Sequence, residues 1–114
     1  MRIDMHAHYM PPALAQDREF FAREPYWEYL IQPGSSKSVQ GWAMPERMIA
    51  DMDRAGIDKI VLQGEYFLQH ESAVWRNDQV LEIVKRYPDR VLAFAALQPK
   101  AGAPALVLRS AIPN

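Results

Sequence analysis

The sequence predicts an α/β domain built on parallel strands, because strand-like segments alternate with amphipathic helical segments along the chain. Strands are expected over residues 2–8, 58–62 and 91–97. The second contains the run Ile-Val-Leu and the third has no charged residue, as is typical of parallel strands buried on both faces. Helices expected to begin at Pro45 and near Asn77 would join consecutive strands by right-handed crossovers.

Each of these two helices has recognisable ends. In the first, Pro45 suits the first turn and Gly56 suits the position just past the last turn. The second is expected to be capped by Asn77 or Asp78 and to end at Pro88. Its apolar stripe has helical spacing and consists of Val80, Ile83, Val84 and Tyr87.

The first strand carries the most informative motif of the chain, two histidines two residues apart. Because side chains alternate along a strand, Asp4, His6 and His8 are expected on one face. Imidazole is the commonest metal ligand, so this pair indicates a site for one divalent cation, the alternative being ordinary exposed histidines. The apolar residues of the strand are expected to pack against helices on the opposite face: Ile3, Met5 and Ala7.

Two segments do not fit a regular strand–helix alternation. Residues 9–44 form a connection far longer than usual, rich in aromatic residues, with a helix expected over 14–23. Such a connection is a packed structural cap, a lid that contacts substrate, or both. At the other end, Pro104 could start a helix, but its residues show no amphipathic stripe.

The segment IDMHAHYMPP, residues 3–12, resembles the first strand of the amidohydrolase-related family that includes the aminocarboxymuconate-semialdehyde decarboxylase-like enzymes. Two later segments agree with it: PERMIADMDRAGIDKIVLQG (45–64) and NDQVLEIVKRYPDRVLAFAALQP (77–99). The match fades in the tail, residues 101–114. The resemblance implies a (β/α)8 TIM barrel with a divalent metal at its C-terminal mouth.

Such a barrel needs about 250 residues, so the domain expected here, residues 1–114, is the N-terminal part of one, with residues 9–44 as an insertion. The resemblance assigns metal binding to His6 and His8. It places the catalytic residues beyond residue 114.

Four further residues are candidates for the second shell or the mouth of the site. Glu65 and His70 are expected in a loop after the second strand, where either could be a third ligand. The alternative is a solvated side chain for His70 and a carboxylate satisfied by backbone donors for Glu65. Asp4 could orient a ligand or bond to backbone. Trp75 could line a pocket for an aromatic or unsaturated acid, or simply cover helix ends.

The function expected from the resemblance is that of a metal-dependent hydrolase acting on a small carboxylic-acid or cyclic substrate. Non-oxidative decarboxylation by the same family is the alternative. The implied metal is most often zinc, but a site without cysteine, built on histidine and carboxylate, would also suit manganese or iron. An alternative of a different class is a catalytically inactive, truncated product that self-associates.

The amino-acid composition limits the classes of molecule that the protein is expected to bind. With 13 basic and 14 acidic residues, the net charge of −1 gives no reason to expect binding to nucleic acid or to a membrane surface. The strand motif follows the first Met directly, which leaves no room for a signal peptide, and we expect a cytoplasmic protein. Open strand edges favour a homo-oligomer.

Overall fold

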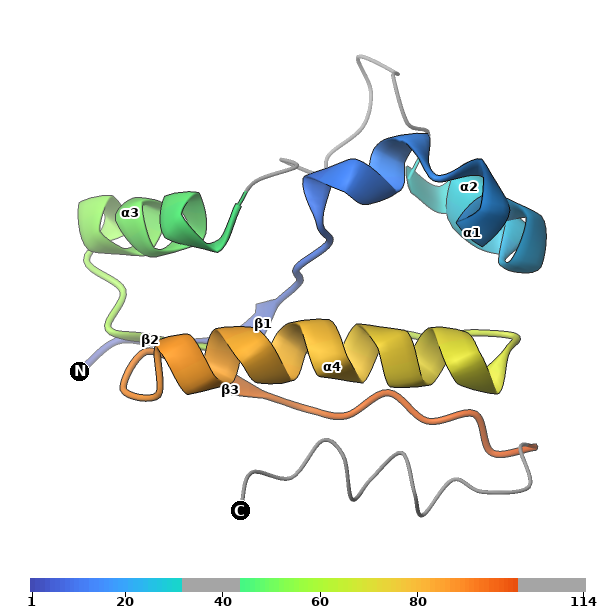
Figure 1. The fold of residues 1–114 in the computed structure, drawn as a ribbon. Coiled ribbons are helices and arrows are strands. Elements are labelled where there is room, and N and C mark those ends of the chain that lie inside the picture. Colours follow the sequence, from blue (N-terminus) through green and yellow to red (C-terminus); the bar gives the residue numbers. More distant parts are fainter. Residues whose placement is uncertain (32–43, 101–114) are drawn as a thin grey trace.

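The computed structural model describes residues 1–31 and 44–100, which form a three-stranded parallel sheet with helices around it (Figure 1). The strands are β1 (Ile3–Ala7), β2 (Lys59–Leu62) and β3 (Val91–Ala93), in the order β1-β2-β3. The helices are η1 (Pro12–Gln16), α1 (Arg18–Arg23), α2 (Pro25–Ile31), α3 (Pro45–Ala55) and α4 (His70–Arg86). The predicted α/β class with parallel strands is confirmed.

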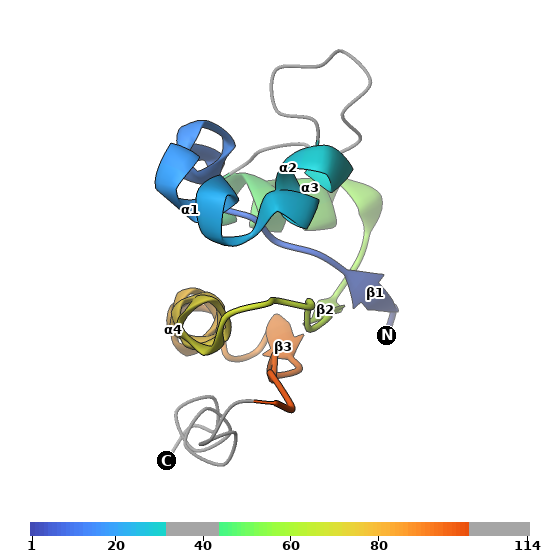
Figure 2. The same ribbon diagram turned by 90° about the vertical axis from the view of Figure 1, so that its right-hand side faces the viewer.

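The sheet is centred on β2, which is buried over Ile60–Leu62 and pairs with both neighbours. Helix α4 runs alongside β3, whereas α1, α2 and α3 lie toward the β1 side of the molecule (Figures 1 and 2). The sheet core lies between β2, β3, α3 and α4. Its buried residues are Tyr9, Met52, Ile60, Leu62, Val80, Ile83 and Val91.

A second apolar cluster joins the segment after β1 to the loop after β2 and to the first turns of α4. It will be called the cap core, and its buried residues are Met10, Leu14, Phe20, Phe21, Trp27, Phe67, Ala73 and Ala96. The helix expected over 14–23 is divided into η1 and α1 at Asp17, whose carboxylate accepts a hydrogen bond from Phe20 N at 2.9 Å. Helix α2 was not predicted.

Helix α3 has the predicted ends. It starts at Pro45 and finishes at Ala55, and Gly56 adopts φ 70°, a left-handed conformation that glycine reaches without steric cost. The prediction for the next helix was wrong at its start, because α4 begins at His70 and neither Asn77 nor Asp78 caps it. Asn77 instead lies inside α4, buried against the segment after β3.

Strand β3 is shorter than the predicted range 91–97. Phe94 N still donates to Leu62 O at 2.9 Å. Beyond it, the Asn77 amide receives Ala96 N–H at 2.7 Å and donates to Ala96 O at 2.9 Å. The Asn77 side chain on α4 therefore makes the two backbone hydrogen bonds of Ala96 that a neighbouring strand would make, and the chain leaves the sheet here.

The expectation that the apolar face of β1 packs against helices was wrong for two of its three residues. Ile3 is 45% exposed and Met5 is 60% exposed, and only Ala7 contacts the sheet core. The physical reason is the position of β1 at the edge of the sheet, where no helix among the described residues covers this face.

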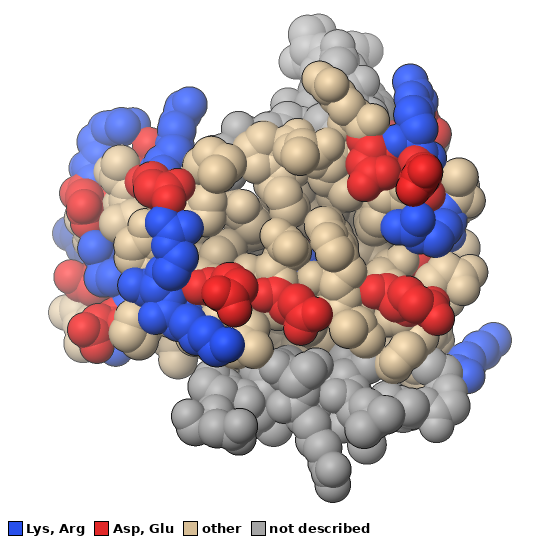
Figure 3. Space-filling view, in the orientation of Figure 1, with Lys and Arg blue, Asp and Glu red and all other residues tan. Residues whose placement is uncertain are grey.

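Charged side chains are unevenly spread over the surface (Figure 3). Acidic groups lie along the lower middle of this face at the level of α4, and groups of both signs occur on the side of α1 and α2. Charged groups are densest at the end where α3 and α4 finish. There Arg86 donates to Glu46, which lowers the pKa of the Glu46 carboxyl and raises the pKa of Arg86. Within the described residues, no helix is both long and apolar enough to cross a bilayer.

The sheet core predicts a large difference between two leucines. Leu62 is 0% exposed at the centre of the sheet and Leu68 is 62% exposed in a loop. We expect Leu62→Ala to lower the free energy of unfolding by about 2–5 kcal/mol, because it leaves a cavity. Urea unfolding followed by circular dichroism should show a far smaller change for the matched control Leu68→Ala. Equal losses would contradict the placement of the core.

Candidate metal centre

The two histidines of the first strand meet at their outer ring nitrogens. His6 lies in β1 and His8 just after it, and their Nε2 atoms are 3.1 Å apart. Two nitrogens at about 2.0–2.1 Å from one metal, on neighbouring coordination positions, would be about 2.9–3.4 Å from each other. The pair therefore has a separation that fits a shared divalent ion.

The inner nitrogen of His8 faces a carboxylate. His8 Nδ1 lies 3.4 Å from Glu65 Oε1, which comes from the loop after β2. An ionised carboxylate only accepts hydrogen bonds, so in a neutral His8 ring a hydrogen bond to Glu65 places the proton on Nδ1 and leaves a lone pair on Nε2. Which of the two Nε2 atoms donates in their 3.1 Å contact depends on the tautomers of the two rings.

Glu65 is itself held by a buried arginine. Arg76 Nη2 donates to Glu65 Oε1 at 2.9 Å, and Arg76 Nε lies 2.8 Å from Glu65 Oε2. The two side chains are 2% and 4% exposed, so the pair is almost fully removed from water. A buried carboxylate with two contacts to one guanidinium has little freedom to reorient.

The loop that carries Glu65 is fixed to β1 and to the segment after β3. Gln63 N donates to Ala7 O at 2.9 Å, and its side-chain amide donates to Met5 O at 2.5 Å. The next residue is Gly64, where a Cβ atom would lie only 2.9 Å from Ala95 O. Glycine is therefore required for this close approach, which sets the direction in which Glu65 leaves the backbone.

Tyr9 follows the histidine pair and turns into the sheet core, where it is 8% exposed. Burial raises the pKa of its hydroxyl above the usual value, and the positive charge of Arg76 is the largest opposing effect. Arg76 is thus an electrostatic neighbour of both the segment after β1 and the loop after β2.

The side chains of the other predicted site residues do not contact the ring nitrogens of the histidine pair or the Glu65 carboxylate. Asp4 Oδ1 accepts a hydrogen bond from His6 N at 2.9 Å, which is the backbone alternative considered for it. His70 begins α4 rather than lying in the expected loop, and its Nδ1 is buried without a partner among the described residues. Trp75 packs in the cap core, its ring centroid 5.5 Å from that of Phe20. Their roles at a metal site stay predictions.

Within residues 1–31 and 44–100, no group of three His, Asp or Glu side chains is arranged to hold a metal ion. The described part of the chain therefore offers two convergent ligands, His6 and His8.

The described part of the expected 9–44 connection is a packed cap. Glu24 is 1% exposed and accepts hydrogen bonds from Leu68 N at 2.7 Å and Gln69 N at 2.8 Å. Trp27 Nε1 donates to Tyr66 O at 2.7 Å. The cap is thereby tied to the loop that carries Glu65. Residues 32–43 lie outside the described residues, and contact of this connection with substrate stays a prediction.

Arg76 and Glu24 were missed by the sequence analysis. A signal for Arg76 was present, because it lies four and seven residues before Val80 and Ile83, on the buried stripe of α4. A charged residue on such a stripe requires a buried partner. The sequence spacing of α4 does not show that the partner of Arg76 is Glu65.

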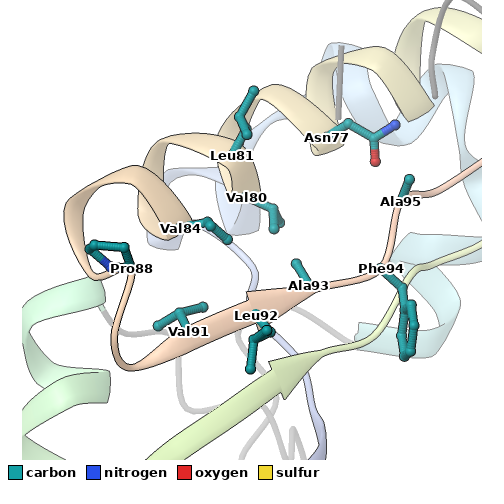
Figure 4. A pocket seen from close by; sticks show the side chains of 10 residues that line it. All are labelled: Asn77, Val80, Leu81, Val84, Pro88, Val91, Leu92, Ala93, Phe94 and Ala95. Carbon is teal, nitrogen blue, oxygen red and sulfur yellow. The ribbon is translucent and has the colours of Figure 1, made fainter. Parts of the chain in front are cut away.

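A separate hollow of about 230 Å³ lies between α4 and β3 (Figure 4). Figure 4 shows Val80 and Val84 pointing from the helix toward Ala93 on the strand. Its lining is apolar apart from Asn77 and includes none of His6, His8 and Glu65. This hollow is therefore distinct from the histidine pair.

No family model matches the chain, and no curated protein matches it significantly. Solved structures do match. The fold is shared with amidohydrolase proteins. The 5-carboxyvanillate decarboxylase of Novosphingobium aromaticivorans DSM 12444, with bound manganese and 3-methoxy-4-hydroxy-5-nitrobenzoic acid, superposes with a TM-score of 0.64 and 23% identity, over 88% of this chain and 35% of that one.

A second structure of that decarboxylase, also with manganese, gives the same TM-score and identity and is covered over 34% of its length. A protein described as amidohydrolase II has a TM-score of 0.65 and 20% identity, over 98% of this chain and 37% of that one. The chain spans about a third of the length of these structures. The predicted partial TIM barrel and the resemblance in fold are confirmed.

The anchoring of the cap predicts unequal effects for two tryptophans of the cap core. We expect Trp27→Phe to destabilise the chain by about 1 kcal/mol more than Trp75→Phe, because it also leaves the Tyr66 carbonyl without its donor. Urea unfolding measures the difference, and limited proteolysis should show faster cleavage near Tyr66 in the first variant. Equal behaviour of the two variants would contradict this anchoring.

Proposed function

We propose that the chain supplies the first-strand part of the metal centre of a divalent-metal-dependent enzyme of the amidohydrolase-related family. The observation that carries the proposal is the 3.1 Å separation of His6 Nε2 and His8 Nε2 at the end of β1. The sequence resemblance assigns metal binding to the same two residues. The manganese in two fold neighbours adds support.

His6 and His8 would hold the ion from one side and leave its remaining positions open. A bound divalent ion supplies an activated water molecule or a partner for a substrate carboxylate. We propose a small carboxylic-acid or cyclic substrate. Zinc, manganese and iron all suit a histidine and carboxylate donor set. The general acid or base is proposed to lie beyond residue 114.

Hydrolysis is the broader reaction class proposed here, and non-oxidative decarboxylation is the second candidate. A specific observation favours the second, because two fold neighbours are 5-carboxyvanillate decarboxylase structures that contain a nitrobenzoic acid. Both reactions would use the same histidine pair. The residues that distinguish them are proposed to lie on later strands of the barrel.

Metal binding by the pair can be tested with Mn²⁺, which broadens the NMR signals of nearby nuclei. We expect substoichiometric Mn²⁺ to broaden the ring signals of His6 and His8 first. The double substitution His6→Ala with His8→Ala should abolish selective broadening of residues around Ala7.

The third histidine of the chain provides a matched control, since His70→Ala should leave the broadening of His6 and His8 unchanged. Selective broadening that survives the double substitution would overturn the proposed function. Loss of the selective broadening in the His70→Ala variant would instead assign His70 as a metal ligand.

We also propose that the chain self-associates. This second proposal belongs to a different functional class and does not require a metal ion. Apolar side chains are exposed on both edge strands. Met5 on β1 is 60% exposed, Leu92 on β3 is 49% exposed, and Phe94, just after β3, is 58% exposed. Parallel edges with exposed apolar groups are templates for pairing with another chain. A homo-oligomer would cover them.

A charge placed on one edge should separate such an oligomer. We expect Leu92→Lys to shift the chain toward monomer in sedimentation velocity, because a lysine on the edge opposes strand pairing. Leu68→Lys, at a leucine that is 62% exposed away from the strands, is the matched control and should leave the mass unchanged. A monomeric unmodified chain at high concentration would refute self-association.

A further inference from the structure

We propose that Glu65 is a positioning residue, which fixes the proton of His8 on Nδ1 and so directs the His8 Nε2 lone pair outward, toward His6 and a shared metal ion. This inference deepens the proposed function and rests on it. It also assigns a role to Arg76, which holds Glu65 in place from α4.

The two ring nitrogens of His8 make contacts in different directions. Glu65 Oε1 lies 3.4 Å from Nδ1, and His6 Nε2 lies 3.1 Å from Nε2. The two ring nitrogens point to different sides of the imidazole. Glu65 therefore occupies the side of the ring away from the convergent Nε2 atoms, which is the position of a carboxylate that orients a metal-bound histidine.

Arg76 holds the Glu65 oxygen that faces His8. Oε1 accepts a hydrogen bond from Arg76 Nη2 at 2.9 Å and faces His8, while Oε2 lies 2.8 Å from Arg76 Nε in an ion pair that forms no hydrogen bond. To become a metal ligand, Glu65 would have to leave a guanidinium that is 2% exposed. Removing one partner of a buried ion pair is strongly unfavourable. A positioning role keeps every one of these contacts.

Glu65 is held more rigidly than the His8 ring that it faces. Glu65 is 4% exposed in its side chain, whereas His8 is 41% exposed. The exposed ring of His8 could rotate or change tautomer freely in water, but a fixed acceptor at Nδ1 selects one orientation and one tautomer. Arg76 lies in α4 and Gly64 abuts Ala95, so the acceptor is fixed from two elements.

The decisive measurement is the tautomer of His8 in the metal-free chain. Long-range ¹⁵N–¹H spectra of the ¹⁵N-histidine-labelled chain should show a protonated Nδ1 and an unprotonated Nε2 for His8. An Nε2-protonated His8 in the unmodified chain would overturn the proposal directly. This readout needs no metal, so it is independent of whether the proposed metal function is correct.

The acceptor is removed by the double substitution Glu65→Leu with Arg76→Met, which replaces a buried ion pair by apolar side chains of similar size and avoids a lone buried charge. We expect His8 to gain the Nε2-protonated tautomer. Zn²⁺ affinity should fall by about 10–100-fold, the usual effect of losing such a partner.

Glu24→Gln is the matched control, because Glu24 is another buried carboxylate but bonds to Leu68 N and Gln69 N rather than to His8. It should leave the His8 tautomer and the Zn²⁺ affinity unchanged. An unchanged tautomer in the double variant would overturn the proposal.

If the double variant does not fold, the single substitution Glu65→Gln decides, since a neutral amide beside Arg76 is a weaker acceptor and should reduce the Nδ1-protonated fraction. Failure of the metal function appears differently, as a chain that has the expected His8 tautomer but binds Zn²⁺ equally well with and without both histidines.

Discussion

The parallel pairing of β1 with β2 is the constraint on which the candidate site depends. Ala7 lies opposite Leu62, so the residues that follow each strand emerge at the same edge of the sheet. His8 comes from the first strand and Glu65 from the second, and no other pairing direction would bring them together. The pairing is held in turn by Gln63, which bonds to the backbone of Met5 and Ala7.

The fold was predictable from local patterns where those patterns are strong. Pro45 and Gly56 mark the ends of α3 because both act through their own backbone geometry, and the apolar run of β2 reflects burial on two faces. The direction shared by His6 and His8 follows from strand alternation alone. These features need no knowledge of distant parts of the chain.

The remaining features depend on contacts between distant residues. Asn77 has the residue type of a helix cap, but its amide serves Ala96 from within the helix, so local preference was overridden by a tertiary bond. Arg76 and Glu65 are separated by a loop and two turns of helix, and only the fold shows that they form one buried pair. The exposure of Met5 likewise depends on which elements surround β1, information that its alternation pattern lacks.

The position of β1 has a consequence for how firmly its histidines are held. Four of its five residues are exposed, and among the described strands it has only β2 as a neighbour. Such an edge element opens in local fluctuations at a lower free energy than the central strand. An ion that bound the docked strand more tightly than the opened one would slow amide exchange in β1. For such an ion, metal affinity and the docking of β1 would be two measurements of one coupled equilibrium.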